Sequence, residues 1–342
     1  MGTSGEWVVI GLDNGGTSNN ATVLDSSGRF LVHQLAETPS DVLAGPAAAL
    51  TAMERSLADV LGRAGVPLTA VRGVGLDTPG PASADGVFTV NGSTNFSHPL
   101  WRSFDIRTAL ATRLGLPVVY NNDGNAAALY AHFHYFGTEA TRRSSVAAIV
   151  GTGLGGGVIE AGRVIKGAAG MAGEFGHITI GMAGLLAAGQ PQPVCNCGLA
   201  GDVESVASLT AIGRNLLPYW LARHPGHGLA AVTPVASAAR LVRGLGEKGD
   251  PMALQIFEQQ AMALGRLFTI AANFTDPDAY FVGGGVVETA SAFRDWFLGR
   301  VREHTALRAE QKPAARFALV PDRDMAGARG AAIAALEALR AP

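Results

Sequence analysis

The chain has 342 residues, of which 48% are hydrophobic and 16% charged, a composition typical of a globular protein with a sizeable core. A net charge of −2 and scattered Lys and Arg residues offer no basic surface, so we expect no nucleic-acid partner. No apolar run reaches the roughly 18 residues of a membrane span, so no membrane partner is expected, and two cysteines without a disulfide framework predict a reducing, cytoplasmic location.

The first half of the sequence alternates predicted strands and helices. Short β-branched runs at 7–12 and 21–24 predict a hairpin around the turn DNGGT. Apolar residues at helical spacing then predict a helix over 46–64. The elements that follow are a strand ending in a Pro/Gly-rich loop within 71–83, a helix at 105–114, a strand at 116–123 and a helix at 125–137.

The second half repeats this theme. Residues 144–167 predict a strand, a glycine-rich turn, a second strand, and a third strand after the turn at 160–162. Residues 203–273 are largely helical in pattern, and 278–297 predict strand, glycine turn and helix. A helix rich in small residues ends the chain. The repeat predicts two α/β domains of related design with a cleft between them.

Three glycine-rich turns are candidate phosphate sites: DNGGT at 13–17, GTGLGGG at 151–157 and VGGG at 282–285. Glycine lets main-chain N–H groups approach an anion closely, and a threonine hydroxyl adds a donor. Taken alone, each turn is better explained as a tight hairpin. None matches the Walker A pattern, and residues 151–157 lie between predicted strands, unlike a dinucleotide-binding fingerprint.

Three polar segments are candidates for chemistry. NNDGN at 121–125 places the carboxylate of Asp123 at the end of an apolar strand, where it can accept a proton or simply form a turn. GEFGH at 173–177 spaces Glu174 and His177 so that one turn can direct both at a ligand. In CNCGLAGDVES at 195–205, two thiols and Asp202 can bind zinc together with His177, or the thiols can be plain buried residues of a loop.

Taken in order, these segments resemble the ROK family of sugar kinases and sugar-responsive repressors, within the actin/hexokinase-like superfamily. The most specific stretch is GTGLGGGVIEAGRVIKGAAGMAGEFGH at 151–177, and the likeness covers nearly the whole chain. It implies an α/β fold of two ribonuclease-H/actin-like α/β domains flanking an interdomain cleft. We expect a smaller N-terminal domain at 1–122, a larger domain at 123–327, and a C-terminal helix, 328–342, packed back on the first domain.

The resemblance also implies roles for individual residues. Asp123 would be the general base that takes the proton from the sugar hydroxyl attacking the γ-phosphate of ATP. Asp13 would orient Mg²⁺, and Gly284 and Gly285 would flank the nucleoside. The residues implied to hydrogen-bond the sugar are Asn95, Asn122, Glu174, His177 and Glu204. Those implied to hold phosphates are Gly15, Gly16, Thr17, Gly151, Thr152 and Gly153.

Two features depart from the family pattern. The family's zinc ligands are one His and three Cys, whereas here the set is His177, Cys195, Cys197 and Asp202, and an insertion lengthens the interval after His177. The sequence therefore leaves structural zinc open. Ser18 also stands where the family often has Lys, which removes one cationic contact to phosphate while leaving Mg²⁺ and main-chain donors.

The sequence predicts an ATP-dependent sugar kinase, most simply one that converts glucose to glucose 6-phosphate. The altered cysteine segment keeps open a kinase of an amino sugar or a C7-cyclitol. A non-catalytic sugar-sensing ROK protein is the third possibility, which the intact Asp123 argues against, and the few residues before the first strand leave no room for a helix-turn-helix. From the resemblance we expect a homodimer or a dimer of dimers.

Overall fold

The computed structural model describes residues 7–80, 82–89 and 96–340. The described chain forms two compact units. The first lies within residues 1–138, 162–172 and 321–342, and the second within 139–161 and 173–320. Helix α3 (Asp123–Phe136) therefore belongs to the first unit, whereas the sequence-based boundary placed it in the second.

The first unit is built on a mixed five-stranded sheet with the strand order β3-β2-β1-β4-β5. Strands β1 and β2 form an antiparallel hairpin, while β4 and β5 continue the sheet in parallel with β1. The carboxyl ends of β1, β4 and β5 therefore meet at one edge. The strands are β1 (Val8–Asn14), β2 (Ser18–Asp25), β3 (Ala36–Pro39), β4 (Val71–Thr78) and β5 (Val118–Asn122).

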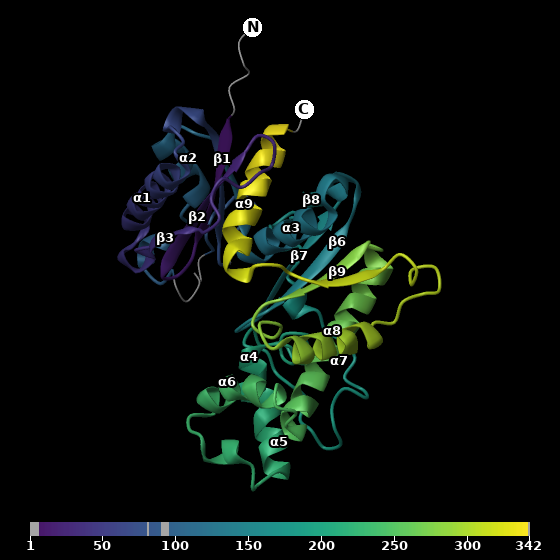
Figure 1. The fold of residues 1–342 in the computed structure, drawn as a ribbon. Coiled ribbons are helices and arrows are strands. Elements are labelled where there is room, and N and C mark those ends of the chain that lie inside the picture. The colour runs from purple at the N-terminus through teal and green to yellow at the C-terminus, as the bar shows by residue number, and fades with distance from the viewer. Residues whose placement is uncertain (1–6, 81, 90–95, 341–342) are drawn as a thin grey trace. The chain divides into compact units, whose positions relative to one another are not determined.

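Helices α1 (Pro46–Ala64), α2 (Ile106–Leu114), α3 and α9 (Arg323–Arg340) complete this unit, and Figure 1 shows α9 running beside its sheet. Helix α9 approaches β1 and β4 at two glycines. A Cβ atom at Gly11 would overlap the carbonyl oxygen of Ala328, and one at Gly75 would overlap that of Ala331. The absent side chains allow the helix to lie directly on the sheet.

The second sheet repeats the arrangement of the first. Its strand order is β10-β9-β6-β7-β8, with an antiparallel β6–β7 pair and with β9 parallel to both β6 and β10. Each sheet thus consists of a hairpin extended by parallel strands. The repeated sequence pattern predicted the two hairpins around glycine turns, and the structure adds the parallel strands. The strands are β6 (Ser145–Val150), β7 (Leu154–Glu160), β8 (Arg163–Val164), β9 (Ala279–Gly283) and β10 (Arg316–Leu319).

Each unit has its own hydrophobic core. In the first, side chains of the sheet and α1 pack together, including Ile10, Leu12 and Met53. In the second, the long helix α7 supplies Leu264 and Phe268, which are fully buried. The helices of the second unit are α4 (Leu209–Ala211), α5 (Leu217–Arg223), α6 (Val235–Gly246), α7 (Pro251–Phe274) and α8 (Ser291–Glu303).

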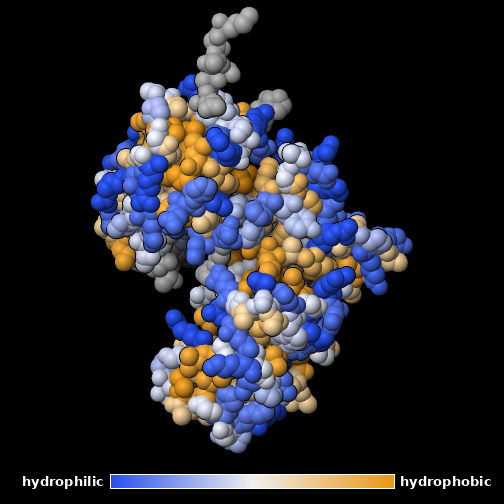
Figure 2. Space-filling model, in the orientation of Figure 1, coloured by the Kyte–Doolittle hydropathy of each residue, from blue (hydrophilic) through white to orange (hydrophobic). Residues whose placement is uncertain are grey.

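The visible surface of each unit is mostly hydrophilic, with smaller hydrophobic patches between (Figure 2). Among the described residues, no helix has the length and apolar character that crossing a membrane requires. Two mixed α/β sheets of the same topology confirm the fold class predicted from the sequence.

Candidate active site

The turn DNGGT joins β1 to β2 as a tight hairpin. The N–H of Gly15 donates to the carbonyl of Ser18 at 2.9 Å, and the N–H of Ser40 donates to the carbonyl of Thr17 at 3.1 Å. The buried amides of Asn14 and Asn19 hydrogen-bond across the base of the turn at 2.6 Å. The turn is therefore braced from below, while Thr17 at its tip is exposed.

Asp123 is the first residue of α3, directly after β5. The preceding Asn122 caps the helix, because its Oδ1 accepts from the N–H of Asn125 at 2.8 Å. The carboxylate of Asp123 accepts from the N–H of Gly124 at 2.7 Å and is open to solvent. The protein atoms around this carboxylate still displace enough water to raise its pKa above the ordinary 3.8. A reachable carboxylate with a raised pKa is a suitable general base.

The structure adds one acid that the sequence did not single out, Asp77 in β4. The strand register pairs it with Asp13 of β1, and the three carboxylates of Asp13, Asp77 and Asp123 influence one another electrostatically. Burial, opposed by a hydrogen bond from Asn20 and aided by the nearby Asp123, raises the pKa of Asp13 to about 6. Burial and the charges of Asp13 and Asp123 likewise raise the pKa of Asp77 well above its usual range. The edge where β1, β4 and β5 end is therefore strongly acidic.

In the second unit, the turn Gly151–Thr152–Gly153 joins β6 to β7. The N–H of Gly151 donates to the carbonyl of Gly153 at 2.9 Å, and Thr210 donates to the carbonyl of Thr152 through both its N–H and its hydroxyl. The chain entering α4 thus holds the turn from one side. The main-chain N–H groups of such a turn are suited to an anion.

Gly284 and Gly285 follow β9 and lie against the end of β6. Gly284 adopts a φ of +87°, and a Cβ atom there would overlap the carbonyl of Val150. Arg243 of α6 donates from Nη1 to the carbonyl of Gly285 at 2.5 Å. Only glycine can adopt this φ and also leave room for the carbonyl of Val150, so position 284 requires glycine. The close approach to Val150 also places this turn next to the turn at 151–153 within the second unit.

The predicted sugar-binding residues are divided between the two units. Asn122 belongs to the first unit, while in the second unit Glu174 precedes the short 3-10 helix Phe175–His177 and His177 ends it. Glu204 accepts from the N–H of Leu154 at 2.8 Å through Oε2 and from the thiol of Cys195 at 3.3 Å through Oε1. Glu204 therefore braces the second glycine turn as well. Asn95 lies outside the described residues.

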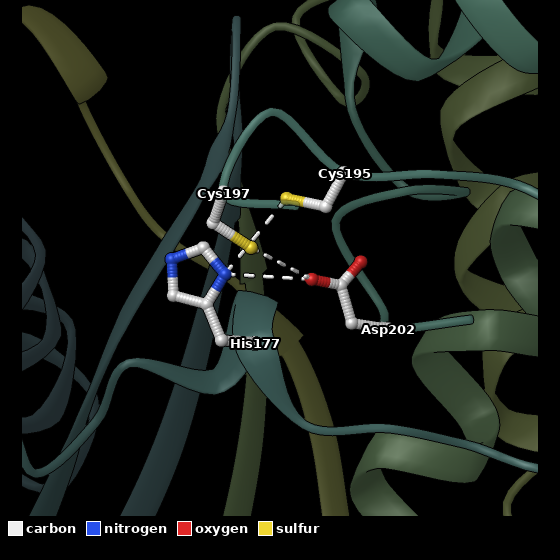
Figure 3. A group of neighbouring side chains, drawn as sticks. All are labelled: His177, Cys195, Cys197 and Asp202. Carbon is white, nitrogen blue, oxygen red and sulfur yellow. Dashed lines mark hydrogen bonds and ion pairs between the residues drawn. The ribbon is translucent and has the colours of Figure 1, made fainter. Parts of the chain in front are cut away.

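Figure 3 shows that His177, Cys195, Cys197 and Asp202 converge, with their four candidate ligand atoms all within 4.8 Å of one another. Nδ1 of His177 lies 3.4 Å from Oδ2 of Asp202 and 3.9 Å from Sγ of Cys195, and Sγ of Cys197 lies 3.7 Å from the same Oδ2. Tetrahedral zinc, with bonds of about 2.0–2.3 Å, separates its ligand atoms by about 3.3–3.8 Å. The separations of 3.4 and 3.7 Å fall within that range and the separation of 3.9 Å lies just above it, so the four side chains are close to a tetrahedral arrangement.

The surroundings of Asp202 also suit a metal ligand. Its side chain is fully buried, and its second oxygen, Oδ1, accepts from the N–H of Ser205 at 2.8 Å. That bond leaves Oδ2 directed at the thiols and the imidazole. Such support orients a ligating carboxylate. The donor set fits zinc, with a carboxylate replacing one thiolate.

Comparisons with known proteins agree with this geometry. Residues 9–338 match the model of the ROK family. A glucokinase from Halalkalibacterium halodurans is 31% identical over 310 residues, covering 88% of this chain and 86% of that protein. An N-acetylmannosamine kinase from Yersinia pseudotuberculosis is 30% identical over 277 residues, covering 81% of this chain and 82% of that protein.

Solved structures show the same likeness. A ROK hexokinase from Thermus thermophilus superposes with a TM-score of 0.75 at 30% identity, covering 97% of this chain and 99% of that one. A ROK family glucokinase from Streptomyces griseus, solved in complex with glucose and AMPPNP, gives a TM-score of 0.68 at 28% identity, covering 96% and 99%. The family model spans nearly the whole sequence, and the chain belongs to the ROK family.

Proposed function

We propose that this protein is an ATP-dependent kinase of a hexose-like sugar, most simply one that phosphorylates glucose to glucose 6-phosphate. The observation that carries the proposal is the placement of Asp123, a solvent-accessible carboxylate with a raised pKa at the first turn of α3. The glucokinase relatives and the glucose- and AMPPNP-bound family structure support the same activity.

In this proposal Asp123 accepts the proton of the attacking sugar hydroxyl. In phosphoryl transfer the protein takes little part in covalent chemistry, so positioning and charge stabilisation supply most of the rate enhancement. The capping bond from Asn122 fixes the first turn of α3 and with it the main chain that carries Asp123. The base is thereby held on a rigid element.

The glycine turns are proposed to bind the nucleotide. The turns at Gly15, Gly16, Gly151 and Gly153, with the hydroxyls of Thr17 and Thr152, would hold phosphates, and Gly284 and Gly285 would flank the nucleoside. The N–H groups of Gly15 and Gly151 close their own turns, so these two glycines would shape the phosphate sites and allow close approach. Asp13 would hold Mg²⁺, which neutralises charge on the phosphates when it is bound. The bracing of each turn by Ser40 or Thr210 supports this role, because a preorganised anion site needs fixed N–H groups.

Sugar hydroxyls are proposed to bind Asn122, Glu174, His177 and Glu204, together with Asn95. Oε2 of Glu204 accepts from the N–H of Leu154 and retains a lone pair for a hydroxyl donor. Oε1 accepts from the thiol of Cys195 in the metal-free protein and would be released for a sugar hydroxyl when Cys195 is deprotonated as a zinc ligand. Glu204 would therefore couple sugar binding to the turn at 151–153. His177, as a zinc ligand through Nδ1, would retain Nε2 for the sugar.

A kinase of an amino sugar or a C7-cyclitol is the second candidate. The N-acetylmannosamine kinase relative is 30% identical, almost as similar as the glucokinase. The segment between His177 and Cys195, next to the proposed sugar contacts, is also where this sequence departs from the family pattern. A sugar-sensing protein without catalysis is less well supported, since Asp123 is in place.

We further propose that zinc is bound by His177, Cys195, Cys197 and Asp202, and that the zinc has a structural role. The donor spacing near tetrahedral values supports this proposal.

A homodimer or a dimer of dimers, in a cytoplasmic location, remains a proposal that rests on the family resemblance. Sedimentation velocity at working concentration measures the oligomer directly.

The experiment that tests the proposed function is an ATP-consumption screen across hexoses, amino sugars and cyclitols, with zinc analysis of the same sample. We expect turnover with one of these classes, and a loss of roughly 10²–10⁴-fold in Asp123→Asn, in which the amide cannot accept the proton. The variant should keep the wild-type melting temperature. Near-normal turnover in that variant would refute the assignment of the base, and no turnover with any class would refute the kinase.

A further inference from the structure

Asp77 lies in a row of polar side chains at the carboxyl ends of three parallel strands. The register pairs it with Asp13 on one side and with Asn121 on the other. Residues paired across neighbouring strands point to the same face of a sheet. Gly75, two residues earlier in β4, contacts α9, so this row points to the face that α9 covers.

The carboxylate of Asp77 is fully buried, and no cationic side chain among the described residues pairs with it. Neither oxygen has a hydrogen-bond partner among the described residues, apart from a weak interaction with its own main-chain N–H. The neighbouring Asn121 also has a buried, unpartnered acceptor, Oδ1. Buried polar groups are almost always paired, and an ionised carboxylate left alone in the interior is strongly unfavourable. The atoms without partners are oxygens, which indicates that the missing partner is a cation or a proton.

The space between the acids favours a cation. A Cβ atom at Gly327 of α9 would lie 3.0 Å from Cγ of Asp13 and 3.0 Å from Oδ2 of Asp77. The two carboxyl groups therefore approach the same point, beside a glycine that carries no side chain. Hard divalent cations such as Mg²⁺ are bound by one or two carboxylates and by further oxygens.

We propose that Asp77, together with Asp13, holds a divalent cation of the Mg²⁺ class, and that the protein binds this cation before any nucleotide is present. The inference deepens the proposed function and rests on it for the cation's role in phosphoryl transfer. The binding itself does not depend on kinase activity. Asp77 thus becomes a positioning residue for the cation, additional to Asp13.

The test is a titration of the nucleotide-free protein with Mn²⁺, in which electron paramagnetic resonance measures the free ion. We expect the wild-type protein to bind Mn²⁺ in competition with Mg²⁺, and Asp77→Asn to weaken the binding by at least about tenfold. Asp59→Asn is the matched control, because it removes an exposed carboxylate paired with Arg63 in α1. This control should bind Mn²⁺ as the wild type does.

A second variant guards against misfolding of the first. Gly327→Ala keeps both acids and favours the helix, but its methyl group would occupy the point where the two carboxyl groups meet. It should weaken Mn²⁺ binding as well. Wild-type Mn²⁺ affinity in both variants, with a higher melting temperature for Asp77→Asn, would identify Asp77 as a buried protonated acid and overturn the proposal. Absence of Mn²⁺ binding by the wild type would also overturn it, while Mn²⁺ binding without sugar phosphorylation would count against the kinase alone.

Discussion

The protonation state of Asp123 determines whether it can act as a base. Its pKa is raised because the surrounding protein atoms displace water from the carboxylate, and hydrogen bonds from the main-chain N–H groups of Gly124 and of Asp123 itself oppose this rise. A raised pKa means that, as the pH falls, Asp123 becomes protonated at a higher pH than an ordinary aspartate does. Because Asp123, as the proposed base, can accept a proton only when it is ionised, we expect activity to decline at a higher pH than it would with an ordinary aspartate.

We therefore expect kcat/KM to fall as the pH decreases, with an apparent midpoint above the ordinary value of 3.8. The measurement is a pH profile at saturating Mg²⁺, accompanied by circular dichroism to show that the fold persists. Any residual activity of Asp123→Asn should lack this acid limb. A profile that stays level down to the ordinary aspartate pKa would show that Asp123 is not perturbed in the working enzyme.

Asp202 offers a second test at the level of one residue. Its Oδ2 is the point to which His177 and Cys197 converge, and a thiolate there would recreate a set of one His and three Cys. We expect Asp202→Ala to lower zinc affinity by at least about tenfold and Asp202→Cys to raise it, because thiolate is a strong zinc ligand. Competition with a chromophoric chelator measures both, and equal affinity in all three proteins would exclude a metal role for Asp202.

Some site residues could be predicted from the sequence and others could not. Asp123 and the four candidate zinc ligands lie in short segments whose spacing already indicates chemistry, and the structure brings those four ligands together. Asp77 gave no such signal, because one acid before a Pro-Gly loop is ordinary in sequence. Its importance comes from the register that places it beside Asp13, 64 positions away in the chain. Pairing of distant strands is not encoded locally.

At the scale of elements, the packing of α9 on the first sheet depends on missing side chains. Gly11 and Gly75 lie on neighbouring strands, and neither has room for a Cβ atom beneath the helix. Gly330 of α9 makes the corresponding close approach to Ala126 of α3. Because these overlaps are with main-chain atoms, a side chain could be accommodated only by moving the whole helix.

We expect Gly75→Ala to destabilise the protein by about 1–3 kcal/mol, the usual cost of forcing a group into a filled interior. Gly62→Ala is the matched control, since Gly62 is exposed in α1 and has open space at the Cβ position. It should stabilise slightly, by about 0.5 kcal/mol, through helix propensity. Urea unfolding of both variants measures the difference, and similar stabilities would show that α9 can shift without cost.

Local elements were predicted well where periodicity is strong. The helix predicted over 46–64 is α1, with the same limits, and the helix predicted over 105–114 is α2, one residue shorter. The region 203–273 was predicted only as largely helical, and it contains four helices, α4 to α7, with a π-helical turn between the first two. Small residues and prolines blur the apolar period there, so the breaks between helices depend on tertiary packing.

At the scale of the whole molecule, the chain carries the same strand order twice and buries two separate cores. The sequence indicated the repetition through its alternating strands and glycine turns. It did not give the strand order, which depends on the pairing of segments far apart in the chain and which the structure supplies. Two cores raise a physical question about stability, namely whether the chain unfolds as one body or unit by unit.

Local destabilisation of each unit answers that question. Gly75→Ala perturbs the first unit, and Gly265→Ala perturbs the second, where a Cβ atom at position 265 of α7 would overlap His304. If each core is a separate cooperative unit, each variant should speed amide hydrogen exchange mainly in its own unit and leave the slowest amides of the other unchanged. Hydrogen–deuterium exchange of proteolytic peptides, with Gly62→Ala as the neutral control, gives the comparison. Equal loss of protection in both units from either variant would show that the two cores unfold together, and single-site stabilities would then describe the whole chain.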